Sequence, residues 1–76
     1  MVEVFKTNVK ERMDASMLID QIHKAFRGYK ANFDLDDCDR ILRVKSTMGP
    51  VESHRLIGLV KELGFKAEIL PDIVMR

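Results

Sequence analysis

The sequence predicts one α+β domain with two layers, in which a four-stranded antiparallel sheet carries two helices on one face. Three observations lead to this prediction. The chain has 76 residues, enough for a single domain. Its apolar residues alternate between the period of two that is typical of strands and the period of 3.6 that is typical of helices. A short pattern also occurs twice, because "RGYKANFDL" resembles "LGFKAEIL", and each copy follows a helical stripe.

The first half of the chain predicts a strand, a helix and a second strand. Residues 2–5 form the first strand, in which we expect Val2 and Val4 to face the core. Asp14 is expected to cap the helix, because its carboxylate can accept free backbone N–H groups. The second strand covers residues 29–35, where apolar and polar residues alternate. The helical stripe between them consists of Leu18, Ile19, Ile22, Ala25 and Phe26.

The second half predicts a hairpin, a strand, a helix and a last strand. The polar stretch "DDCD" is typical of a turn, and residues 40–46 form the strand after it. Pro50 suits the first turn of the second helix, where its missing donor is no loss. Gly28 and Gly64 are expected to end the two helices in the left-handed conformation. The second stripe consists of Leu56, Leu59, Val60 and Leu63, and Phe65, Ala67 and Ile69 face inward in the last strand.

Right-handed crossovers join these elements into a ferredoxin-like βαββαβ sandwich with the strand order 4-1-3-2. The domain is expected to cover residues 1–71, with residues 72–76 as a C-terminal tail. The first strand–helix loop, the "DDCD" turn and the Gly64 turn should then lie at the same end of the sheet. The expected core consists of Leu18, Ile22, Phe26, Phe33, Val44, Leu56, Val60, Leu63 and Phe65.

The composition is that of a globular protein, with 46% hydrophobic and 33% charged residues. A net charge of +1 gives no general attraction to nucleic acid or to membranes, so neither is an expected partner. Cys38 is the only cysteine, which favours a reducing compartment. The N-terminal residues lack the pattern of a signal peptide, and no segment approaches the length of a membrane span. These features predict a cytoplasmic protein.

The stretches "IHKAF", "GYKANFDL" and "LVKELGFKAEIL" follow a known order of strands and helices. Over residues 2–70 the chain resembles the heavy-metal-associated domains of copper chaperones and metal-transporting ATPases. That family carries Met-x-Cys-x-x-Cys before its first helix, in register here with "MDASML", residues 13–18. Met13 keeps the methionine, but Ala15 and Leu18 stand at the cysteine positions. Soft ions such as Cu(I) need thiolate or thioether ligands, so the resemblance implies a domain that has lost its metal motif and holds no cofactor.

Two residues remain as weak candidates for a soft-metal site. Cys38 lies at the same end of the predicted sheet as Met13, which we expect to pack under the loop. A lone cysteine is a poor chelate, so such a site would have to form across a dimer. A metal chaperone or sensor that uses Cys38 is therefore the alternative function.

The other polar residues do not indicate a calcium site, a histidine site or an enzyme. The carboxylates around Cys38 lack the central glycine and terminal glutamate of a calcium loop. His23 and His54 lie beside the helical stripes, where we expect them to face solvent. The sequence contains no pairing of nucleophile and base that would indicate an enzyme. The carboxylates in question are Asp34, Asp36, Asp37 and Asp39.

The candidate partner-binding residues are Lys6, Lys10, Arg12 and Lys66, which should lie near one another. In the family that this chain resembles, this end of the domain docks onto partner proteins by charge complementarity. The expected function is therefore that of a non-enzymatic binding or regulatory domain whose partner is another protein or a second copy of the chain. If a homodimer forms, we expect it to use the open sheet face, with Phe5, Ile41 and Leu70 at its centre.

Overall fold

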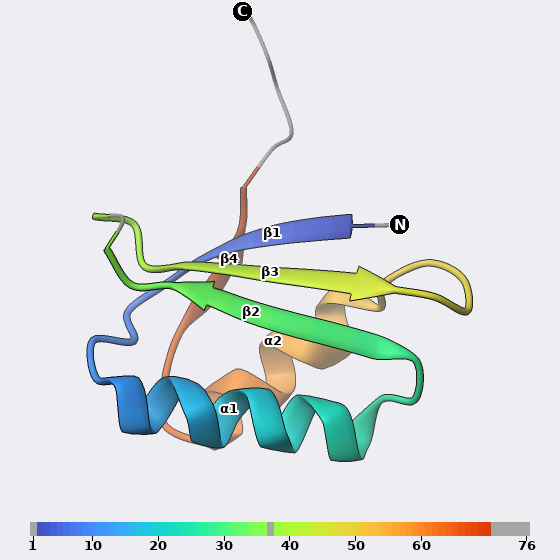
Figure 1. Ribbon diagram of the computed structural model, residues 1–76, viewed down its shortest axis with the longest axis horizontal. Helices are drawn as coiled ribbons and strands as arrows, with labels where there is room; N and C mark the ends of the chain where they lie inside the picture. The colour runs from blue at the N-terminus through green and yellow to red at the C-terminus, as the bar shows by residue number, and fades with distance from the viewer. Residues whose placement is uncertain (1, 37, 71–76) are drawn as a thin grey trace, which may run out of the picture.

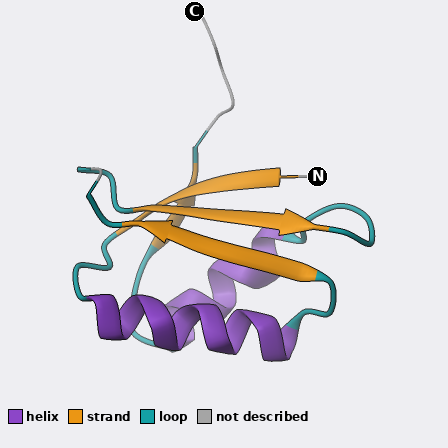
Figure 2. Ribbon diagram, in the orientation of Figure 1, coloured by secondary structure: helices purple, strands orange, loops and turns teal. Residues whose placement is uncertain are grey.

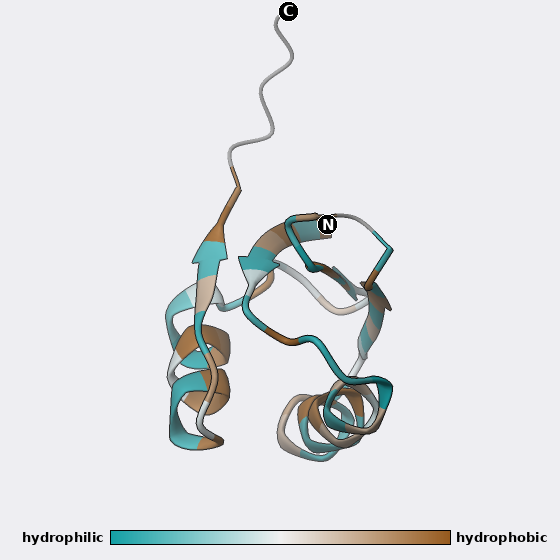
Figure 3. Ribbon diagram, turned by 90° about the vertical axis from the view of Figure 1, so that its left-hand side faces the viewer, coloured by the Kyte–Doolittle hydropathy of each residue, from teal (hydrophilic) through white to brown (hydrophobic). Residues whose placement is uncertain are grey.

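A computed structural model describes residues 2–36 and 38–70 and confirms the predicted fold. Figure 1 shows the sheet above two helices, and the side view in Figure 3 places both helices on the same face. The strand order β2-β3-β1-β4 is the predicted order read from the other edge, and every neighbouring pair is antiparallel. The elements are β1 (Val2–Thr7), α1 (Arg12–Ala25), β2 (Tyr29–Asp34), β3 (Ile41–Ser46), α2 (Ser53–Glu62) and β4 (Ala67–Ile69).

Figure 2 shows the strands as one layer and the helices as the other, and the residues of the hydrophobic core come from both layers. Six of the nine expected core residues are buried there. The other three are half-buried and pack against this core, because each lies near an edge of the layer. The buried six are Leu18, Ile22, Phe26, Val44, Leu56 and Val60, and the half-buried three are Phe33, Leu63 and Phe65.

The prediction of which side chains of β1 face the core was wrong. Phe5 is completely buried in the core, whereas Val2 is 55% exposed and Val4 is half-buried on the outer face. Both alternations in this strand carry apolar residues, and burying the aromatic ring removes the larger apolar area from water. Phe5 pairs with Leu42 of β3 and with Ile69 of β4, so it lies in the middle of the sheet. Its side chain is on the face that the helices cover. Ile69 is 44% exposed, since β4 is an edge strand with one uncovered flank.

The expected apolar centre of the open sheet face is also absent. Phe5 points to the helices, and Ile41 is only 6% exposed. Ile41 lies outside the core cluster, between Lys6 of β1 and Asp34 of β2, whose positions flank it on both sides. Leu70 is half-buried, and its N–H donates to the Val4 carbonyl at 2.8 Å. The open face therefore does not offer the three exposed apolar side chains that the predicted dimer required.

Both helices start elsewhere than the sequence predicted. The N-cap of α1 is Glu11, whose carbonyl accepts the Ala15 N–H at 3.0 Å, and Asp14 lies inside the first turn. There its charge still suits the positive end of the helix dipole. Helix α2 has Glu52 as its N-cap, so Pro50 precedes it. The Tyr29 hydroxyl accepts the Glu52 N–H at 2.6 Å and thereby supplies a partner for a free donor at this helix start.

The helix ends confirm the expected role of Gly64 but not that of Gly28. Gly64 has a φ of 95°, its N–H donates to the Lys61 carbonyl at 3.0 Å, and the Phe65 N–H reaches back to the Val60 carbonyl at 3.1 Å. This pair of bonds is a Schellman motif. Helix α1 instead ends at Phe26, whose backbone is extended, and Gly28, with a φ of 78°, lies two residues further on in the turn into β2. Ala25, the last residue of α1, is exposed rather than part of the buried stripe.

In the part of the chain that is described, neither helix has the length and apolar character needed to cross a membrane. The proposed tail, residues 72–76, lies outside the described residues, as does the domain boundary at residue 71.

The buried position of Phe5 predicts a large effect on stability. Phe5→Ala should lower the free energy of unfolding by about 3–5 kcal/mol, because it empties an aromatic-sized site in the core. Val2→Ala, in the same strand but on the exposed side, should change it by no more than about 0.5 kcal/mol. Urea unfolding followed by circular dichroism measures both. Equal effects for the two variants would contradict this orientation of β1.

Candidate functional site

Three loops meet at one end of the sheet, which we call the loop end. They are residues 8–11 before α1, residues 35–40 between β2 and β3 (residue 37 is not described), and residues 63–66 before β4. The N–H of Thr7, the last residue of β1 before the first loop, donates to the Asp39 carbonyl at 3.2 Å, which ties the start of the first loop to the second. The Asn8 Oδ1 accepts the Lys66 N–H at 2.9 Å, which joins the first and third. The predicted meeting of these loops is therefore confirmed.

Thr7 anchors the long loop before α1. Its buried Oγ1 donates to the Arg40 carbonyl at 2.6 Å and accepts the Val9 N–H at 3.2 Å. Val9 is fully buried, so this loop inserts an apolar side chain into the core. The Arg40 Nη1 in turn donates to the Leu35 carbonyl at 2.6 Å, which closes the hairpin. The loop end is thus held by specific bonds between segments far apart in the sequence.

The four predicted partner-binding cations are all exposed at or near the loop end. Lys6 is partly engaged, because its Nζ lies 3.9 Å from the Asp39 Oδ1. An exposed pair of this kind contributes little to stability. Lys10, Arg12 and Lys66 form no ion pair with any other described residue.

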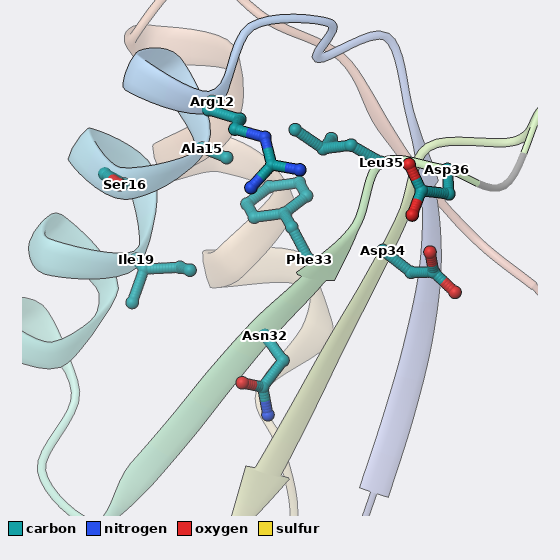
Figure 4. A pocket seen from close by; sticks show the side chains of 9 residues that line it. All are labelled: Arg12, Ala15, Ser16, Ile19, Asn32, Phe33, Asp34, Leu35 and Asp36. Atoms are coloured by element: carbon teal, nitrogen blue, oxygen red, sulfur yellow. The ribbon is translucent and has the colours of Figure 1, made fainter.

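These cations do not form a single cluster, because they border two separate hollows. Arg12 lines a groove of about 350 Å³ between α1 and β2, where Figure 4 shows its side chain above Phe33. Lys66 lines the second hollow, between α2 and β4, together with Lys61. Since β2 and β4 are the opposite edges of the sheet, Arg12 and Lys66 lie on opposite sides of the loop that carries Lys10.

Lys61 was missed by the sequence reasoning. It stands three residues before Gly64 in the turn that ends α2, and that turn leads directly to Lys66. The helix-ending glycine could have placed the two lysines near each other.

The positions of the family's metal motif lie inside α1. Ala15 and Leu18 are both buried and face the core, one helical turn apart. Met13 is 84% exposed, so the expectation that it packs under the loop is wrong. The reason is that α1 begins at Arg12 and Val9 fills the space beneath the loop instead.

Cys38 is exposed in the hairpin turn. Among the described residues, no group of three or more histidine, cysteine, aspartate or glutamate side chains could hold a metal ion.

One histidine has a role that the sequence did not indicate. His23 and His54 are both exposed, as expected, but the His23 Nε2 accepts the Ala31 N–H at 3.3 Å. This bond joins α1 to the outer side of edge strand β2. Eight residues separate the two partners, and no local pattern indicates such a contact.

The chain matches no protein-family model, no curated protein and no solved structure.

Cys38 is exposed and belongs to no group of metal ligands among the described residues, which predicts weak metal binding. A single thiolate supplies one ligand, whereas Cu(I) and Zn(II) sites in proteins use several. Titration with Cu(I) under reducing conditions, followed by native mass spectrometry, should give no tight complex, and Cys38→Ser should behave like the native chain. A stoichiometric complex that Cys38→Ser abolishes would contradict this prediction.

Proposed function

We propose that this chain is a non-enzymatic binding or regulatory domain that docks a partner protein with an acidic surface at its loop end. The observation that carries the proposal is the hydrogen-bond network of Thr7 and Asn8. It fixes three loops relative to one another, and these loops and the first residue of α1 carry the exposed cations Lys10, Arg12 and Lys66.

A fixed surface suits binding, because loops that are already ordered lose little conformational entropy when a partner docks. The cations lack ion-pair partners among the described residues, so they are available to carboxylates of another protein. Electrostatic complementarity of this kind raises the association rate and selects the partner. The resemblance to heavy-metal-associated domains supports the same end of the domain as the docking surface.

The proposal is tested with three immobilised forms of the chain. The loop-end variant carries Lys10→Glu, Arg12→Glu and Lys66→Glu. The control variant carries Lys24→Glu, Arg27→Glu and Lys45→Glu, which are exposed positions away from the three loops. Both variants change the net charge by the same amount, so a difference between them reports where the charge lies.

Proteins retained from a cell extract are quantified by mass spectrometry, after thermal melts have shown that all three forms are folded. We expect the native chain and the control variant to retain acidic proteins that the loop-end variant does not retain. This difference between the variants should be larger at low salt, where contacts between exposed charges are strongest. If the loop-end variant retains the same proteins as the native chain, the proposed docking surface is wrong.

A further inference from the structure

We infer that the free edge of β2 pairs with β2 of a second copy of the chain, in antiparallel register about Asn32, so that two sheets join into one. This inference stands apart from the docking proposed at the loop end, because it uses a different element. It rests on the backbone groups of β2 that point to its outer edge, on the charges along the strand and on the groove beside it.

The register of β2 with β3 identifies the backbone groups that point to the outer edge of the sheet. The Thr47 N–H donates to the Gly28 carbonyl at 2.9 Å, which makes this pair a hydrogen-bonded one. Pairing then alternates along the ladder, so Lys30, Asn32 and Asp34 bond to β3. The N–H and C=O groups of Ala31 and Phe33 point the other way, to the open edge. Edge groups of this kind are ready to pair with another strand.

The charges along β2 are complementary to those of a second, antiparallel β2. In a pairing centred on Asn32, Lys30 of each copy stands directly opposite Asp34 of the other. Within its own chain Lys30 is opposite Lys45, a like charge that is unfavourable at this spacing. Neither Lys30 nor Asp34 forms an ion pair with another described residue. The second copy would therefore supply two ion pairs that a single copy lacks.

On the helix side of the sheet, the same pairing sets Phe33 of each copy opposite Ala31 of the other. Phe33 and Ile19 are half-buried and line the groove between α1 and β2 (Figure 4). A second strand along this edge would cover part of their exposed apolar surface. The contact is isologous, so it closes at two copies and does not extend into a filament.

His23 restrains this pairing. Its Nε2 occupies the Ala31 N–H, which would otherwise donate to the Phe33 carbonyl of the second copy. The Phe33 N–H and the Ala31 carbonyl remain available, so two backbone bonds form without moving His23 and two more form when it swings aside. The dimer is therefore expected to be weak in the native chain and tighter without the imidazole.

Sedimentation equilibrium at rising concentration tests the inference with variants at Lys30 and Asp34. The native chain should dimerise by about millimolar concentration. Lys30→Asp alone and Asp34→Lys alone should each weaken the dimer by about tenfold or more, because two attractive pairs become two repulsive ones. An equimolar mixture of these two single variants should recover the dimer, since every facing pair is then of opposite charge. Thermal melts check that both variants remain folded.

The mixture is specific to this register, because other registers place different residues opposite Lys30 and Asp34. His23→Ala should tighten the dimer several-fold. The inference is overturned if the native chain stays monomeric near millimolar concentration. It is equally overturned if the mixture dimerises no better than the single variants, or if His23→Ala weakens the dimer.

Discussion

The rest of this small domain depends on one constraint, which is that the Phe5 side chain faces the core. β1 lies between β3 and β4, so its register sets the faces of the strands on both sides. A slip of one residue would turn every side chain of the strand to the other face. With Phe5 inward, Thr7 is also inward, and its hydroxyl is buried where it can bond the Arg40 carbonyl and the Val9 N–H. The packing of one aromatic ring thus leads directly to the hydrogen bonds of the loop end.

The loop end is the feature with the clearest capacity for function. Val9 anchors the loop before α1 in the core, and Asn8 ties it to the backbone at Lys66. Here the space at the helix start is occupied by apolar side chains, because Ala15 and Leu18 face the core. What remains exposed is charge on fixed loops, which suits contact with another protein better than chemistry on a small molecule.

Much of the fold could be predicted from the sequence, because apolar periodicity and the repeated glycine pattern are local signals. Gly64 ends α2 as expected, and the strand order followed from the handedness of the crossovers. The error in β1 arose because the local signals were balanced there. Val2, Val4 and Phe5 are all apolar, so only the tertiary packing decides which alternation faces inward. The contact of His23 with Ala31, and those of Thr7 with Val9 and Arg40, depend on the assembled fold, so the candidate site could be placed from sequence but its network could not.

In the free chain, hydrogen bonds from Thr7 and Asn8 hold the loop end as a fixed surface before any partner arrives. Amide hydrogen exchange of the native chain, followed by NMR, tests this most directly. The N–H groups of Val9 and Lys66, which donate to Thr7 and Asn8, should exchange much more slowly than the N–H of the exposed Lys10 in the same segment. If Val9 and Lys66 exchange as fast as in an unstructured peptide, the loops are not held in place and the loop end is not a fixed surface.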